Sequence, residues 1–254
     1  MWRPVSVTRH KEGCFHEETC DRSTTVAALT GSALAADMPV KAPAAPVVRA
    51  VSWTGCYVGA GGGYGMWNQE NTVYNAGGVV ISPQTTAGGR GYFGTVQGGC
   101  DYQFAPNWVV GAFADYDFGS LKGTPTVLGF YGEEKLSSSW AAGGRIGYVV
   151  MPQLLAYFSG GYTQAHFDQL NVVNAPGWSV TSHTYDGFFL GSGYEYGLGW
   201  LPGLFWKTEY RFADYGTDRN AILFGGVPSG FTADQHKYVQ TIRSELVYRF
   251  NWWH

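Results

Sequence analysis

Long stretches of this sequence alternate between apolar and polar residues with a period of two. In one such stretch, Trp108, Val110 and Tyr116 fall on one face of an extended chain, and Asp115 and Asp117 fall on the other. Successive side chains of a β-strand point to opposite faces, whereas a helix repeats about every 3.6 residues. The pattern therefore predicts strands with one apolar face and one face that contains the charged residues.

The alternation predicts eight strands separated by turn-forming segments. We expect the strands at 55–67, 91–104, 108–121, 135–150, 154–168, 183–198, 204–215 and 237–250. The links between them alternate between short turns and long polar loops. The short links are 105–107, 151–153 and 199–203, and the long ones are 68–90, 122–134, 169–182 and 216–236. Short periplasmic turns, long extracellular loops and an even strand number are typical of bacterial transmembrane barrels.

The composition favours a barrel in lipid over a soluble fold. Only 14% of the residues are charged and 17% are aromatic, whereas an ordinary globular chain is about 25% charged. The sequence has no run of 18 or more apolar residues of the kind that a membrane-spanning helix needs. Lipid offers no hydrogen-bond partners, so strands can cross it only as a closed ring without a free edge. We therefore predict an all-β fold, an eight-stranded antiparallel transmembrane β-barrel integral to the bacterial outer membrane.

The charged face is expected to point into the barrel, because a Lys or Arg that faces the bilayer midplane costs about 2 to 4 kcal/mol. The predicted interior charge cluster has five positive and six negative residues: Arg145, Lys207, Arg211, Arg243 and Arg249 with Asp101, Asp115, Asp117, Glu195, Glu209 and Glu245. This near balance predicts a plug of salt bridges. An eight-stranded ring has room only for side chains, so small residues are expected at other inward positions, namely Gly59, Gly61, Gly63, Gly99, Gly143, Gly147, Gly191 and Gly193.

Aromatic residues are expected on the outward face at the two levels where the bilayer meets water. At the periplasmic level we predict Tyr102, Phe104, Trp108, Tyr148, Tyr157, Trp206 and Phe250. At the outer level we predict Tyr64, Tyr92, Tyr116, Trp140, Phe167 and Tyr238.

The N-terminal part is expected to lie outside the barrel. Residues 27–36 (AALTGSALAA) end in an A-x-A-like cleavage motif, so residues 1–36 are predicted to be a leader, although an atypically acidic one. A disordered cytosolic tail is the alternative. Residues 37–52 are predicted to be a Pro/Ala-rich periplasmic tether, since proline has no N–H to pair in a sheet. Residues 53–254 then form the outer-membrane barrel.

Two cysteines, Cys56 and Cys100, lie downstream of the cleavage motif. Both face outward in the predicted register, near the periplasmic ends of neighbouring strands. A disulfide between them is one hypothesis for an oxidising compartment. Two free thiols are the other, because a register shift of one residue would turn one cysteine to the opposite face.

Four segments carry a resemblance to a known family: 35–43 (AADMPVKAP), 53–59 (WTGCYVG), 207–212 (KTEYRF) and 248–250 (YRF). They resemble the small outer-membrane β-barrel proteins of alphaproteobacteria, related to opacity-type porins and the Brucella surface antigens. The resemblance covers nearly the whole mature chain. It implies structural or porin-like roles, and insertion by the barrel-assembly machinery, which reads a C-terminal strand that ends in an aromatic residue. The extra residues 251–254 (NWWH) and the leader depart from that family pattern.

No motif points clearly to catalysis or to a cofactor, so we expect a protein that is not an enzyme and has no cofactor or bound metal. The glycine run 59–63 lies inside a strand with no following helix, which argues against phosphate binding. Asp115 and Asp117 could form a catalytic pair, but counter-ions for the arginines is the simpler interpretation. His166 and His183 lie near a long loop. They could contribute to haem ligation, which the family resemblance implies as an activity of some relatives, or they could be ordinary solvated histidines.

The predicted function is a structural role in the envelope with at most a narrow porin-like pore, because the packed lumen leaves little continuous water. One alternative is a surface ligand-binding or adhesive barrel whose loops contact haem or a host protein. A soluble lipocalin-like carrier is a second, and the low charge content argues against it. The expected partners are outer-membrane lipids, lipopolysaccharide and, during insertion, the barrel-assembly machinery. A net charge of -3 without a basic cluster argues against nucleic acid, and the oligomeric state stays open.

Overall fold

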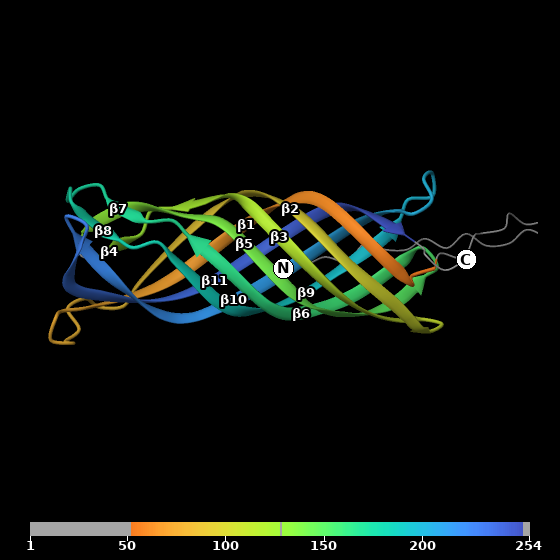
Figure 1. The fold of residues 1–254 in the computed structure, drawn as a ribbon, viewed down its shortest axis with the longest axis horizontal. Coiled ribbons are helices and arrows are strands. Elements are labelled where there is room, and N and C mark those ends of the chain that lie inside the picture. Colours follow the sequence, from red (N-terminus) through yellow and green to blue (C-terminus); the bar gives the residue numbers. More distant parts are fainter. Residues whose placement is uncertain (1–51, 128, 251–254) are drawn as a thin grey trace, which may run out of the picture. The chain divides into compact units, whose positions relative to one another are not determined.

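The computed structural model describes residues 52–127 and 129–250, and in this part all regular secondary structure is β-strand. Eight long strands form a wall (Figure 1). They are β1 (Gly55–Tyr74), β2 (Thr85–Ala105), β3 (Trp108–Gly123), β5 (Phe130–Met151), β6 (Leu154–Phe167), β9 (His183–Gly197), β10 (Leu204–Phe224) and β11 (Val227–Phe250). Three short strands lie together at one end: β4 (Thr126–Val127), β7 (Leu170–Val172) and β8 (Trp178–Val180). Across these described residues, no helix is long and apolar enough to cross a bilayer.

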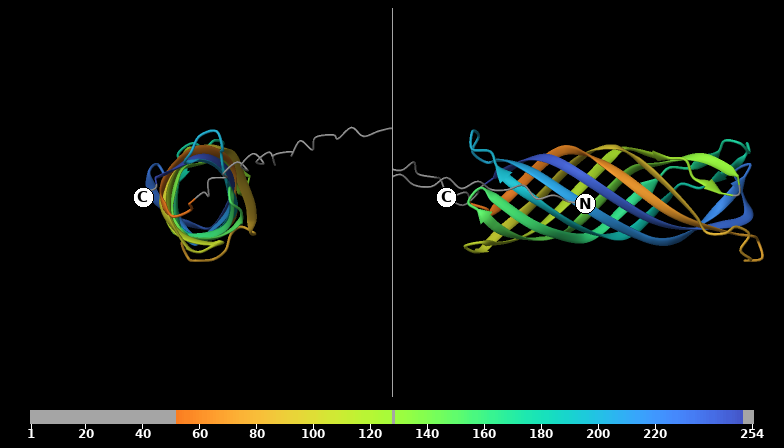
Figure 2. Two further views of the ribbon diagram at one scale, coloured as in Figure 1. Left: turned by 90° about the vertical axis from the view of Figure 1, so that its right-hand side faces the viewer. Right: turned by 180° about the vertical axis from the view of Figure 1, so that it is seen from behind.

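The wall is a closed antiparallel ring. Each long strand pairs with the next one along the chain, and β1 also pairs with β11, from Cys56 opposite Phe250 to Tyr74 opposite Thr232. Figure 2 shows the strands winding obliquely around the ring, viewed end on and from the side. Closure gives every long strand a partner on both sides, which is the condition that lipid imposes on a β-structure. The eight predicted strands and the antiparallel all-β fold are confirmed.

The two ends of the ring differ. Tight turns join β2 to β3, β5 to β6 and β9 to β10 at one end, which we call the turn end, and the first and last described residues lie there too. The other end, the loop end, carries β4, β7, β8 and the links between the remaining strands. The predicted leader (1–36), most of the predicted tether (37–52) and the final residues 251–254 lie outside the described residues.

Two of the four predicted long links are shorter than expected: the first runs only from 75 to 84, and the last is a tight turn. β1 continues to Tyr74 and β2 already begins at Thr85. β10 and β11 are joined by a two-residue turn of Gly225 and Gly226. Both glycines have positive φ, +60° and +82°, which a tight hairpin of this kind requires. The strand extensions were missed because outward positions such as Asn68 and Glu70 are as polar as the inward Gln69, so the alternation fades while the strand continues.

The other two predicted loops are also partly strand. The segment 122–134 contains β4 and the first residues of β5, and the segment 169–182 contains β7 and β8. β7 pairs with β5, β8 pairs with β10, and β7 and β8 pair with each other, so this segment fills the wall between β5 and β10. Pairings between segments so distant along the chain leave no local pattern in the sequence.

The outer surface of the wall is a broad apolar band. Tyr92, Phe158 and Leu190 are 78%, 70% and 60% exposed, respectively. Single exposed apolar residues are ordinary on soluble proteins, but a continuous apolar band around a whole ring needs an apolar solvent. The faces of β3 follow the predicted parity, since Trp108 is exposed and Val109 is buried.

Two of the aromatic residues predicted to face outward face inward instead. Tyr157 is 3% exposed and Phe167 is 1% exposed, and both lie on β6. This strand has apolar residues on both faces, as in Leu154, Leu155 and Ala156, so the sequence does not show which face points inward. The predicted strand is confirmed, but its two faces were assigned the wrong way round for these residues.

Inward glycines make room for inward rings. A Cβ added at Gly143 would lie 2.8 Å from the ring of Phe189, and one at Gly193 would lie 2.7 Å from the hydroxyl of Tyr157. Both distances are well below van der Waals contact, so an alanine at either position would displace the ring. The glycines and the large aromatic residues therefore fill the narrow lumen together.

Candidate functional site: the charged interior of the ring

Four charged side chains form a ring near the turn end, which we call the lower charge ring. They alternate in sign and come from alternate strands of the wall: Asp101 (β2), Arg145 (β5), Glu195 (β9) and Arg249 (β11). Each guanidinium bridges both carboxylates. Arg145 donates to Asp101 at 2.9 Å and to Glu195 at 3.2 Å, and Arg249 donates to both at 2.8 Å. All four side chains are buried, so the ring is a neutral layer that spans the lumen.

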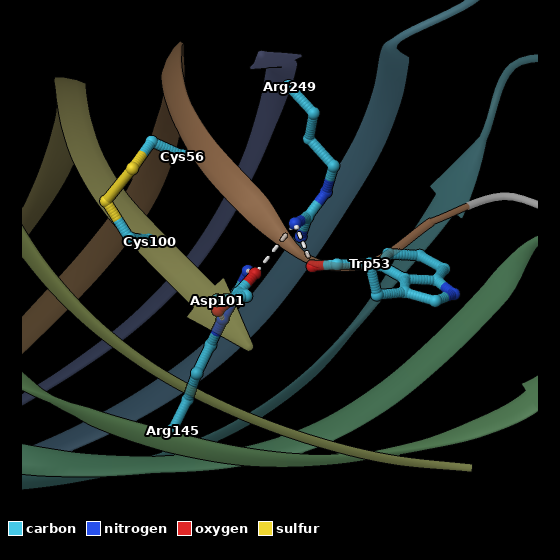
Figure 3. Close-up of a disulfide and its surroundings, with 6 residues drawn as sticks. All are labelled: Trp53, Cys56, Cys100, Asp101, Arg145 and Arg249. Atoms are coloured by element: carbon cyan, nitrogen blue, oxygen red, sulfur yellow. Dashed lines mark hydrogen bonds and ion pairs between the residues drawn. A yellow bond between two sulfur atoms is a disulfide. The ribbon is translucent and has the colours of Figure 1, made fainter. Parts of the chain in front are cut away.

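Aromatic side chains seal the lower charge ring at the turn end. The Arg249 Cζ atom lies 4.9 Å from the ring centroid of Trp53, and its Nη1 donates to the Trp53 carbonyl at 3.2 Å. The Arg145 Cζ atom lies 4.6 Å from the ring centroid of Tyr57. Figure 3 shows Asp101 between the two arginines, with Trp53 beside Arg249. Stacking of a guanidinium on an aromatic face offsets part of the cost of its burial.

A larger group, the central charge cluster, lies further up the lumen. It consists of Lys207, Arg211 and Arg243 with Asp115, Asp117, Glu209 and Glu245, all of them buried. Arg211 donates hydrogen bonds to both oxygens of Asp115, at 3.0 and 2.8 Å. Arg243 donates hydrogen bonds to both oxygens of Asp117, at 3.1 and 2.9 Å. Two-pronged arginine–carboxylate pairs are the strongest form of this interaction.

The two glutamates of the central cluster have unequal environments. Glu209 accepts hydrogen bonds from Arg211 Nε at 3.0 Å and from the Tyr157 hydroxyl at 2.9 Å, and it lies 3.3 Å from Lys207 Nζ. Glu245 lies 3.6 Å from Lys207 Nζ, and neither of its oxygens has a hydrogen-bond partner among the described residues. Glu209 is therefore tied into the cluster, whereas Glu245 interacts with it only through charge.

The sequence prediction missed a third layer, the upper pair of Lys237 and Glu134. Lys237 Nζ donates to Glu134 and to Gln69, and its side chain is fully buried. Aromatic rings surround the ammonium, and the centroid of Phe167 lies 3.9 Å from Nζ. Lys237 has the same parity on β11 as Arg243, which was a signal available in the sequence. Glu134 gave no such signal because it fell in a predicted loop.

Several ion pairs cross the lumen from wall to opposite wall. Arg211 on β10 meets Asp115 on β3, and Lys237 on β11 meets Glu134 on β5. In the order of strands around the ring, three long strands separate the members of each pair on either side. These pairs therefore span the full width of the lumen at their levels. All eleven residues of the predicted interior cluster lie within these layers.

The structure joins Cys56 and Cys100 in a disulfide with an S–S distance of 2.06 Å. The two residues are direct partners on β1 and β2, near the turn end, and Figure 3 shows the bridge on the wall beside Asp101. The disulfide therefore links the first two strands covalently next to the lower charge ring. It corresponds to the first of the two hypotheses for these cysteines.

The remaining predicted site residues are not gathered into a site. The Nδ1 atom of His166 lies 2.9 Å from the Thr184 hydroxyl, and the Nε2 atom of His183 lies 3.2 Å from Asp218. Within residues 52–127 and 129–250, no group of three or more His, Cys, Asp or Glu side chains is placed to hold a metal ion. The glycine run 59–63 lies within β1.

Comparisons with known proteins agree with this architecture. Residues 24–250 match the family described as outer membrane protein beta-barrel domain. The chain is 29% identical over 242 residues to the 31 kDa outer-membrane immunogenic proteins of Brucella melitensis and Brucella suis, covering 86% of this chain and 94% of each relative. The outer membrane protein OprG from Pseudomonas aeruginosa is 13% identical, with a TM-score of 0.54 over 78% of this chain and 97% of that one, a likeness of fold alone.

These findings confirm the resemblance stated from the sequence, and they confirm the predicted location. In a bacterial barrel the short turns face the periplasm, so the turn end corresponds to the periplasmic end and the loop end to the extracellular end. The chain therefore belongs to the outer membrane protein beta-barrel family and is an integral protein of the bacterial outer membrane.

Proposed function

We propose that this barrel has a structural role in the envelope and that its lumen is closed to solutes at rest. The observation that carries the proposal is the ion pair between Arg211 and Asp115, which crosses the lumen between opposite strands. The lower charge ring and the upper pair add two further layers of buried, bound charge. A solute could pass only if every layer opened.

The energetics of buried ion pairs support a closed lumen. Removing one partner of a buried ion pair costs about 3 to 5 kcal/mol, because the other charge is left without compensation. If opening one layer costs about 4 kcal/mol on this scale, about one molecule in a thousand is open at that layer. Three layers in series make spontaneous opening rarer still. Brief conduction through rare openings is the most that this interior supports.

Conductance in planar lipid bilayers tests the proposal. The natural protein should show only rare, small openings. The double variant Arg211→Ala with Asp115→Ala removes the cross-lumen pair and should raise both the open probability and the conductance. The matched control is Tyr210→Ala, which lies on the outward face of the same strand and should leave the conductance unchanged. Steady, large conductance of the natural protein would overturn the proposal.

We also propose that the interior acids are counter-ions rather than catalytic groups. Both oxygens of Asp115 and of Asp117 are held by arginines, and both side chains are buried. A general base needs free access to the proton it removes, which these carboxylates do not have. In assays with peptide and lipid-ester substrates, the folded natural protein and Asp117→Asn should show the same background turnover.

Lipopolysaccharide is the lipid partner that we propose at the loop end. Arg90, Lys122 and Lys135 are direct neighbours on β2, β3 and β5 and lie on the outward face of the wall. With strands about 4.8 Å apart, the backbone positions of the three residues span about 10 Å. Glu133 lies 2.7 Å from Lys122 and Asp168 lies 3.6 Å from Lys135, which leaves a net positive group. Phosphate groups of a lipid headgroup suit such a row.

Lipid carried through purification tests this assignment. The triple variant Arg90→Gln, Lys122→Gln and Lys135→Gln should retain less lipopolysaccharide than the natural protein. Arg219→Gln changes a basic residue on β10 outside the row and serves as the control. Equal retention by both variants would remove lipopolysaccharide as a partner of this row.

A further inference from the structure

A cavity of about 290 Å³ lies at the loop end of the lumen. Apolar side chains from six strands form its walls, among them Val73, Leu170, Trp178, Val180, Ile222 and Phe231. Val73 and Leu170 are buried, whereas Phe130 and Tyr131 at the rim are 50% and 42% exposed. The cavity therefore leads from an exposed rim down to buried side chains.

The walls depend on the segment that contains β7 and β8. Val180 on β8 pairs with Ile222 on β10, and Val172 on β7 pairs with Gly132 on β5. Because β7 and β8 also pair with each other, the two strands fill the wall between β5 and β10 at the loop end. The cavity is thus built by regular strand pairing on several sides, rather than by a gap between unpaired loops.

The floor of the cavity is polar, and one of its donors is unused. Gln69, Asn71 and Gln235 lie there, and Asn71 is 1% exposed. Its Oδ1 atom accepts a hydrogen bond from Gln69, but its Nδ2 atom has no partner among the described residues. The oxygen of Gln235, in contrast, accepts from Tyr185 at 2.7 Å and from Asn220 at 2.9 Å. A buried amide donor without a partner is rare and indicates a missing acceptor.

The charge beneath the floor is balanced. Lys237 donates to Gln69, but Glu134 pairs with the same ammonium, so the upper pair contributes no net positive charge. The ammonium also lies 3.9 Å from the ring centroid of Phe167. A ligand with a carboxylate would therefore meet no free cation at the floor.

We propose that this cavity binds a small neutral amphiphile, an apolar body that ends in one acceptor oxygen such as a ketone or ester carbonyl. The body would lie between Trp178, Ile222 and Phe231, and the oxygen would accept a hydrogen bond from Asn71 Nδ2. A cavity of about 150 Å³ accommodates benzene in an apolar interior, so this one has room for a ligand of about twice that size. The inference does not rest on the proposed structural role of the barrel.

Ligand titrations followed by NMR test the proposal, with ¹⁵N-labelled protein refolded in detergent micelles. The probes are 2-decanone, decane, which lacks the oxygen, and decanoate, which adds a charge. 2-Decanone should shift the Asn71 side-chain amide signals in a saturable way. Decane and decanoate should bind more weakly, each by about tenfold. Tighter binding of decanoate, or equal shifts with decane, would overturn the proposal.

Two variants and a control make the assignment specific. Asn71→Leu removes the donor and should abolish the preference for 2-decanone over decane, as followed on the backbone amide signals of the lining residues Val73 and Ile222. Ala233→Phe fills the cavity from β11 and should abolish saturable binding of both. Asn68→Leu, on the outward face of the same strand as Asn71, should bind like the natural protein. Shifts that persist in Ala233→Phe, or that spread over outward residues such as Leu246, would mean partition into detergent and would sink the proposal.

Discussion

Arg211 and Asp115 meet across the full width of the ring, joined by two hydrogen bonds of 3.0 and 2.8 Å between opposite strands. Neither residue has any relation to the other along the chain, and 95 residues separate them. Their contact follows from two facts alone, inward parity on each strand and closure of the ring. The same two facts determine where the other interior charges lie, so a measurement of their contacts is a test of the strand faces and of ring closure.

Removing a bound acid from the central charge cluster should destabilise the barrel more than removing its unbound neighbour. Glu209→Gln removes the carboxylate that Arg211 and Lys207 contact directly and weakens the hydrogen bond from Tyr157, so we expect a loss of about 3 to 5 kcal/mol. Glu245→Gln, the matched control, removes no hydrogen bond to a described residue and should cost much less. Urea unfolding in lipid vesicles measures both. Equal losses would contradict the described contacts.

Two adjacent glycines should respond differently to alanine. A Cβ at Gly143 would clash with the Gly160 carbonyl oxygen and lie 2.8 Å from the Phe189 ring, so Gly143→Ala should cost about 1 to 3 kcal/mol through overpacking. At Gly144 the nearest atom would be 3.5 Å away, and Gly144→Ala should be nearly neutral. Unfolding midpoints of the two variants decide the matter. The reverse order would mean that the faces of β5 are assigned the wrong way round.

A lysine on the outer wall should impair folding into membranes. Leu246 is 46% exposed on the apolar face of β11, and a lysine there should cost about 2 to 4 kcal/mol if it faces the middle of the bilayer. Val79, which is 60% exposed in the link between β1 and β2, provides the control, and Val79→Lys should have little effect. Folding yields in vesicles of one lipid composition compare the two. Similar yields would argue against lipid contact at Leu246.

The disulfide between Cys56 and Cys100 should be found in protein isolated without reductant. Thiol titration of the unfolded mature chain should then detect no free thiol, and two should appear after reduction. The bridge closes a loop with a sequence separation of 44, so Cys100→Ser should lower stability by about 3 to 4 kcal/mol in the chain-entropy description. Two free thiols before reduction would exclude the bridge.

The sequence was sufficient to predict the wall because period two carries over many residues in strands such as β3. The sequence also predicted the interior charges on that strand. Asp115 and Asp117 lie on the same face of β3, and the cost of a charge in lipid places that face inside the ring. It was insufficient where both faces of a strand have the same character. Tyr157 was assigned to the wrong face because its neighbours on β6 are apolar on both sides.

The loop end was harder to predict for a different reason. Above the bilayer, a strand no longer needs an apolar outer face, so β10 and β11 extend to a turn at Gly225 without the alternation that marks them lower down. Glu134 was missed because it lies in such an extension. The cavity could not be predicted at all, because its walls come from β7 and β8, whose partners are distant in the sequence.

Transfer of NMR magnetisation from lipid acyl chains to side chains tests the central claim most directly, using the unmodified protein in a bilayer. The claim is that hydrocarbon contacts the apolar face of each strand while the charged side chains stay inside the ring. We expect transfer to the methyl groups of Ile242 and Leu246 and none to the guanidinium of Arg243, which lies between them in the sequence but faces the lumen. Transfer from acyl chains to Arg243, with none to Leu246, would contradict the account.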